Sequence, residues 1–260
     1  IFLQYVQVEG LRDAIGEARN QGIGVYCLDS PLVPGILLNV TMPNGVAGAE
    51  MAYYGLNRLG LEGGVVFLNA KWCVPRRRVY AAKAIVGDYS GMDILATEYV
   101  SNESYPSDSF DYMDNWLTRF GNEIDWVYGG WDTLGMPAGR AAKNRNYGIN
   151  DLFITGVDGG SKAFARIRNP EDPFVATYAQ AFEAYVHTLF EAVEEIQVKR
   201  VKPQSEDSMV PSSRTIYHKG VVVDIDNVPS KGTVIHELFN YYDPNATDAW
   251  YTWGEPYTVS

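Results

Sequence analysis

Short apolar runs alternate with amphipathic helical patterns along most of this 260-residue chain. Residues 10–20 place Leu11, Ala14, Ile15 and Ala18 on one helical face, and the nearly all-apolar run 23–28 follows directly. Strands buried on both faces of a parallel sheet have this composition. The same alternation continues, with strands expected at 1–6, 64–70, 94–100, 124–128, 152–157, 174–179 and 221–225, and helices at 46–59, 77–86, 107–120, 134–144, 162–167 and 181–195. The pattern predicts an α/β fold whose parallel sheets are covered by helices on both faces.

Polar and aromatic side chains follow several of these strands at the point where each strand ends. Ligands bind outside the carboxyl ends of strands in open parallel sheets, so these positions are candidates for a binding site. They are Asp29, Arg76 to Arg78, Trp131, Asp132, Asp158 and Gln180. Taken alone, an Asp after a strand is more simply a helix cap or a turn former. Carboxylate, guanidinium, amide and aromatic groups together at five strand ends favour a site for a small polar ligand such as a sugar.

The charge balance argues against nucleic acid as a partner. The formal net charge is -11, and the densest basic cluster is Arg76-Arg77-Arg78. A nucleic-acid interface needs a basic surface, which three arginines do not provide against this excess of acid.

No motif for catalysis, cofactor binding or metal binding stands out. The histidines His187, His218 and His236 form no ligand pair, and there is no nucleophile elbow, phosphate loop or dinucleotide fingerprint. We therefore expect no enzyme activity, no cofactor and no metal. Two points stay open: spacing permits Asp29, Asp132 and Asp158 to converge as a glycoside-hydrolase pair, and Cys27 and Cys73 could either pair or remain thiols.

At the strand ends the sequence resembles the type I periplasmic sugar-binding proteins of the ribose-binding kind. The segments that match are Ala18–Asp29, Asn44–Gly48, Ile154–Gly160 and Ala176–Gln180. The resemblance implies ligand contacts from Asp29, Arg78, Asp158 and Gln180, with Arg77 one step from the arginine position. Trp131 stands where the family often has Asn, which would replace a hydrogen bond by stacking. Tyr105 matches an aromatic contact of the family.

The resemblance also implies two doubly wound lobes with a ligand cleft between them. The N-terminal lobe would hold 1–44 and 181–199, the C-terminal lobe 45–179 and about 205–228, and 229–260 would form an aromatic-rich extension. Crossings are expected near Asn44, near Gln180 and between about 200 and 215. The family begins with two further βα units, so roughly 60 residues are expected upstream of Ile1, at about 30 residues per unit.

The function implied by the resemblance is binding without chemical change. We expect an extracytoplasmic or periplasmic receptor, free or lipid-anchored, that closes on a monosaccharide or polyol and presents it to the membrane subunits of an ABC importer. The alternative is a ligand-sensing effector domain of a signalling or LacI-type regulatory protein, since such domains share the fold and much of the pattern.

Overall fold

The chain folds into two compact units in a computed structural model that describes residues 1–4 and 10–231. The first unit holds 1–43 and 181–219, and the second holds 44–180 and 220–231. Most of the predicted extension at 229–260 lies outside the described residues. The chain passes between units at Pro43–Asn44, Gln180–Ala181 and Lys219–Gly220.

The first unit is built on a four-stranded parallel sheet in the order β1-β2-β3-β9. These strands are β1 (Phe2–Leu3), β2 (Tyr26–Leu28), β3 (Leu38–Thr41) and β9 (Thr215–Tyr217). Two of the strands were not predicted, β3 and β9. The sequence prediction places 215–217 in the other lobe, but this stretch pairs with β3 of the first sheet. The third crossing therefore comes after it, rather than between 200 and 215.

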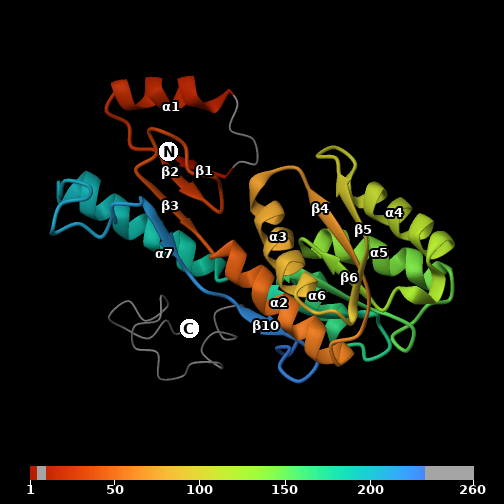
Figure 1. Ribbon diagram of the computed structural model, residues 1–260. Helices are drawn as coiled ribbons and strands as arrows, with labels where there is room; N and C mark the ends of the chain where they lie inside the picture. The colour runs from red at the N-terminus through yellow and green to blue at the C-terminus, as the bar shows by residue number, and fades with distance from the viewer. Residues whose placement is uncertain (5–9, 232–260) are drawn as a thin grey trace. The chain divides into compact units, whose positions relative to one another are not determined.

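Helices α1 (Leu11–Asn20) and α7 (Phe182–Val193) cover opposite faces of this sheet (Figure 1). Ile15 and Ala18 of α1 pack with Val25 and Cys27 in one buried cluster. Tyr26 points to the other face, because successive side chains of a strand alternate, and its hydroxyl accepts a hydrogen bond from Gln197 at 3.2 Å. Gln197 belongs to the π-helical turn Glu194–Val198 that continues α7.

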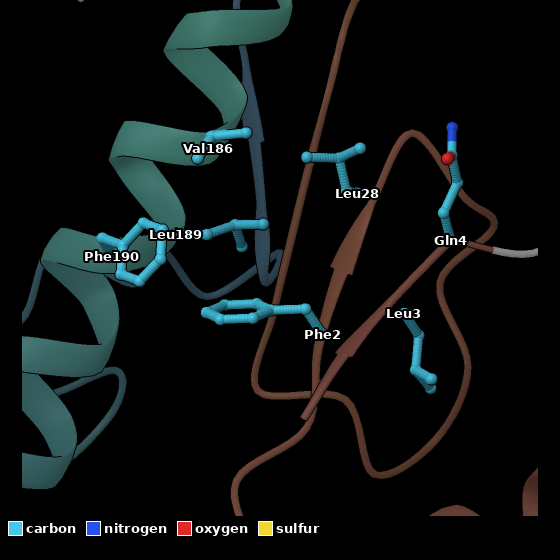
Figure 2. A pocket seen from close by; sticks show the side chains of 7 residues that line it. All are labelled: Phe2, Leu3, Gln4, Leu28, Val186, Leu189 and Phe190. Atoms are coloured by element: carbon cyan, nitrogen blue, oxygen red, sulfur yellow. The ribbon is translucent and has the colours of Figure 1, made fainter.

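An apolar hollow lies beside the edge strand β1 within the first unit. Figure 2 shows Phe2 of β1 pointing toward Phe190 of α7, with Leu3 directed to the opposite side of the strand. The two phenyl rings are 5.4 Å apart, and Phe190 is 58% exposed. The hollow is therefore an open apolar surface on the α7 face, away from the buried cluster under α1.

The second unit is built on a six-stranded sheet in the order β10-β8-β7-β6-β4-β5. The strands are β4 (Gly63–Ala70), β5 (Met92–Val100), β6 (Trp126–Gly129), β7 (Phe153–Asp158), β8 (Phe174–Ala179) and β10 (Val221–Val223). All of them are parallel except the edge strand β10, which runs antiparallel to β8. The apolar runs that predicted β4, β7 and β8 are buried almost throughout, as expected for the middle of a parallel sheet.

Helices cover both faces of this second sheet, as the α/β pattern predicted. They are α2 (Asn44–Leu59), α3 (Cys73–Gly87), α4 (Tyr105–Arg119), α5 (Asp132–Asn144) and α6 (Ser161–Ile167), with a short 3-10 turn at Gly121–Glu123. Gly55 of α2 faces Trp126, whereas Gly135 of α5 faces Ile154, which pairs with Val127. Because Trp126 and Val127 point to opposite sides of β6, α2 and α5 lie on opposite faces (Figure 1).

The direction of winding reverses between β4 and β6. From β4 the chain steps outward to β5, and it then returns to β6 and continues the other way to β7 and β8. In open α/β sheets, ligands bind at such a reversal, outside the carboxyl ends of the strands, which here are β4 and β6. Among the described residues, no helix is both long and apolar enough to cross a membrane.

We predict that Gly55→Ala destabilises the second unit by about 1–3 kcal/mol. A Cβ at Gly55 would lie within 2.6 Å of the ring of Trp126, which is fully buried. The overpacking outweighs the gain of up to about 1 kcal/mol that alanine brings to a helix. Urea unfolding measures the difference.

Gly45→Ala in the same helix is the matched control, because a Cβ there meets nothing within 4 Å. It should leave stability unchanged or raise it slightly. Equal behaviour of the two variants would show that the approach of α2 to Trp126 is not tight.

Candidate ligand-binding site

Five of the six predicted site residues lie in the second unit, at the carboxyl edge of its sheet. Arg78 is on the helix after β4, Tyr105 on the helix after β5, Trp131 follows β6, Asp158 ends β7, and Gln180 follows β8. Asp29 follows β2 in the first unit.

Arg78 is almost completely buried, at 2% exposure. Its guanidinium contacts three segments of the chain. Its Nε donates to Asn44 Oδ1 at 2.7 Å, and its Nη1 donates to the Gly130 carbonyl at 3.2 Å and to Asp158 Oδ1 at 3.1 Å. The acceptors therefore come from the start of α2, the turn after β6 and the end of β7. Arg77, the alternative one step away, is exposed.

The close packing of α2 against α3 allows Arg78 to reach this position. A Cβ at Gly48 of α2 would lie 2.8 Å from the carbonyl carbon of Arg78, so only glycine lets the two helix backbones approach to this distance. One turn earlier in α2, Asn44 is 5% exposed and meets the guanidinium.

Asp158 presents its carboxylate from an unusual backbone conformation. Its φ is 130°, a value that side-chain-bearing residues rarely adopt and that costs on the order of 1–3 kcal/mol. Besides Arg78, its Oδ1 accepts a hydrogen bond from Gln180 Nε2 at 2.6 Å, and its carbonyl accepts the Gln180 backbone N–H at 3.1 Å. Gln180 is 1% exposed, whereas the Asp158 side chain is 30% exposed. Arg78 and Gln180 are therefore buried, whereas the Asp158 carboxylate remains partly exposed.

Three aromatic rings gather at the same edge of the sheet. The ring of Trp131 lies 5.3 Å from that of Trp72 and 5.7 Å from that of Tyr105. Trp131 directly follows Gly130, whose carbonyl accepts from Arg78, so the aromatic group adjoins the charged one. All three rings are half-buried, which leaves part of each surface exposed.

In the first unit, Asp29 resembles Asp158 in its backbone. Its φ is 42°, in the left-handed region, and its Oδ1 accepts a hydrogen bond from the Thr41 hydroxyl at 2.8 Å. Both strand-end aspartates thus adopt a strained conformation, which is common at functional sites. That Asp29 contacts the ligand stays a prediction.

Sequence reasoning missed two site residues and undervalued a third. The sequence indicates Asn44 only as part of a segment that matches the family and as a crossing between lobes, and it gives no sign of a site role for Trp72. Asp132 was considered for a hydrolase pair, but it is 4% exposed and its oxygens are held by backbone and hydroxyl donors, so it is not placed to act on a substrate. Within residues 1–4 and 10–231, no group of His, Cys, Asp and Glu side chains is arranged to hold a metal ion.

We predict that Arg78→Lys lowers the free energy of unfolding by about 1–3 kcal/mol, because at least one buried acceptor loses its donor. A lysine side chain ends in one nitrogen, which cannot donate to Asn44, Gly130 and Asp158 from separate positions as the guanidinium does. Arg77→Lys is the control on the exposed side and should change stability by less than about 0.5 kcal/mol. Equal urea midpoints for the two variants would contradict the role given to the Arg78 fork.

One curated protein is similar to part of this chain. A xylitol-binding protein of Mycolicibacterium smegmatis is 25% identical over 178 residues, which is 67% of this chain and 49% of that protein. The chain thus spans about half the length of that curated relative.

Solved structures of solute-binding proteins share the fold. One from Bacillus halodurans, with bound myo-inositol, gives a TM-score of 0.72 at 17% identity. The aligned part is 88% of this chain and 75% of the Bacillus protein. One from Actinobacillus succinogenes, with bound D-allose, gives 0.74 at 19% identity and covers 88% and 79%.

The family follows from a match to a family model. Residues 1–196 match the model described as a periplasmic binding protein domain. The resemblance drawn from the strand-end segments is confirmed by this match, which extends over most of the chain. The chain belongs to the family of periplasmic binding protein domains.

Proposed function

We propose that this chain is the ligand-binding part of an extracytoplasmic solute receptor that takes up a monosaccharide or polyol and delivers it to an ABC importer. The observation that carries the proposal is the cluster of Arg78, Asp158 and Gln180 beside the rings of Trp72 and Trp131. It lies at the carboxyl edge of the sheet, next to the point where the winding reverses.

The chemistry of this cluster suits a polyhydroxylated molecule. A hydroxyl both donates and accepts hydrogen bonds, so it pairs with a carboxylate on one side and with a guanidinium or amide on the other. The C–H face of a sugar ring is apolar and fits against an indole or phenol face. A mostly apolar wall with a few fixed polar groups is typical of small-molecule sites.

Relatives support the same ligand class. The curated relative is named a xylitol-binding protein, and the two solved structures hold myo-inositol and D-allose. These molecules share a run of neighbouring hydroxyl groups, although two of them are polyols and one is a sugar. Both solved proteins are solute-binding proteins of ABC transporters, which supports delivery to an importer and a location outside the cytoplasm.

A thermal-shift screen tests the proposed ligand class. A ligand that binds only the native state stabilises it by about 2.7 kcal/mol at one hundred times its Kd. The panel contains xylitol, myo-inositol, D-allose and D-ribose, with L-leucine as a control that lacks neighbouring hydroxyl groups. We expect at least one of the four to raise the Tm in a concentration-dependent way. No shift with any of them, or a shift with leucine alone, would contradict the proposal.

We predict that Asp158→Ala weakens binding of the panel compound that gives the largest Tm shift. A hydrogen bond to a carboxylate contributes about 1.5–3 kcal/mol. Its loss corresponds to a rise in Kd of roughly 10- to 150-fold, at about 1.4 kcal/mol per tenfold. Isothermal titration calorimetry measures the change, and circular dichroism shows whether the variant is folded.

Asp93→Ala is the matched control for the loss of one carboxylate. Asp93 is exposed near the start of β5, at the opposite edge of the same sheet. This variant should bind as the wild type does. A folded Asp158→Ala protein with unchanged affinity would show that Asp158 only shapes the turn.

We predict that the indole of Trp131 stacks on the ligand. Ligand binding should then change tryptophan fluorescence, and Trp131→Phe should reduce that change while keeping most of the affinity, because an aromatic face remains. A cavity-wall role would instead lower stability and affinity together.

The neighbouring ring provides the comparison, since Trp72 lies 5.3 Å from Trp131. Wild type, Trp131→Phe and Trp72→Phe are titrated side by side. A ligand-induced change of equal size in wild type and Trp131→Phe would exclude Trp131, and its loss in Trp72→Phe would transfer the stacking role to Trp72.

A further inference from the structure

A second aspartate lies behind the site and is almost completely buried. Asp132 is the first residue of α5 and is 4% exposed. Its Oδ2 accepts the backbone N–H groups of Gly159 at 3.0 Å and Gly160 at 3.2 Å, and its Oδ1 accepts the Thr177 hydroxyl at 2.6 Å. All three donors come from β8 and the turn after β7, far from Asp132 in the sequence.

This arrangement differs from an ordinary helix cap. An aspartate at the start of a helix usually accepts from the first backbone N–H groups of its own helix. No such side-chain cap is formed at the start of α5. Burial, followed by repulsion from Asp158, raises the pKa of Asp132 well above its usual range. A carboxyl group in this position is costly, which points to a role beyond helix stability.

The turn that Asp132 holds has positive φ at two successive residues, and the first of them, Asp158, is not a glycine and is therefore strained. Asp158 has a φ of 130° and Gly159 a φ of 77°. A Cβ at Gly159 would lie 2.5 Å from the Ala179 Cβ, so the turn is also pressed against β8. Such a backbone persists only where its surroundings fix it. The two N–H groups bound by Asp132 are those directly after Asp158.

We propose that Asp132 is a positioning residue of the ligand site, whose carboxylate holds the Asp158–Gly160 turn so that the Asp158 carboxylate meets the ligand. Asp132 is also the peptide neighbour of Trp131. The same residue therefore ties the segment that bears the stacking ring to the turn that presents the carboxylate. The inference rests on the proposed function, since it assigns Asp132 to that same site.

The test compares Asp132→Ala, Asp132→Asn and Asp172→Ala. Asparagine keeps an oxygen that can accept from both glycines, whereas alanine removes it. Asp172 is a buried aspartate of the same unit, 5% exposed, that pairs with Lys143 and Arg166 and accepts the N–H of Phe174 at the start of β8. Its loss should lower stability without touching the turn after β7.

Two readouts are taken on each folded variant. Proton–nitrogen NMR spectra without ligand report the amide shifts of Gly159 and Gly160, and calorimetry with xylitol, myo-inositol and D-allose reports affinity. We expect Asp132→Ala to shift both amides upfield and to weaken binding at least tenfold. Asp132→Asn should restore both toward wild type. Asp172→Ala should lower the Tm while leaving the amides and the affinity unchanged.

The outcomes separate the inference from the function on which it rests. Unchanged glycine amides in Asp132→Ala, or wild-type affinity of that variant, would overturn the positioning role. Asp172→Ala weakening binding as much as Asp132→Ala would also overturn it, because general destabilisation would then explain the loss. If the wild type binds none of the three probes, the proposed function fails, and the amide shifts alone decide whether Asp132 holds the turn.

Discussion

The buried guanidinium of Arg78 is the constraint around which the second unit is arranged. Moving an ion out of water costs several kcal/mol, and the cost is offset only where good partners surround the charge. Here the partners are Asn44, Gly130 and Asp158, from three segments that are far apart in the sequence. The start of α2, the turn after β6 and the end of β7 must therefore all lie within reach of one side chain.

The small residues near Arg78 follow from the same requirement. Gly48 lets α2 approach the backbone of α3 closely. Gly130 has no side chain, and its backbone carbonyl accepts a hydrogen bond from the guanidinium. The positive φ of Asp158 aims its carboxylate at the same point, at a cost in backbone strain. Polar groups fixed in this way change little when a ligand arrives, so less of the binding free energy is lost in ordering them.

The sequence predicted the fold because most strands of the second unit are long apolar runs. Residues 64–70 and 174–179 could hardly be anything but buried strands, and they are β4 and β8. The strands that escaped prediction lack this signal. In β3, Asn39 and Thr41 interrupt the apolar residues, and β9 is a half-exposed three-residue strand in a polar stretch. Pairing with neighbouring strands fixes both, and neighbours in space are not visible in a local pattern.

The site was predictable to the extent that topology alone determines it. Strand ends meet at one edge of a parallel sheet, so Arg78, Asp158 and Gln180 could be placed together from the sequence alone. Trp72 could not be, and Asp132 is among the strand-end candidates but without the contacts that define its role. Trp72 depends on how the loop after β4 folds back, and Asp132 reads as a helix start until its distant donors are seen. The resemblance favours Arg78 over Arg77, and in the structure Arg78 is buried whereas Arg77 is exposed, within a helix that begins at Cys73 rather than at 77.

The pairing of β3 with β9 has a consequence for how the protein forms. Asn39 pairs with Thr215, so nearly the whole second unit lies in the sequence between two adjacent strands of the first. The ends of a long loop meet slowly unless the loop has already become compact. During synthesis, this edge of β3 cannot pair with β9 until the intervening strands and helices have been made. Connectivity therefore predicts that residues 44–180 condense before β9 pairs with β3.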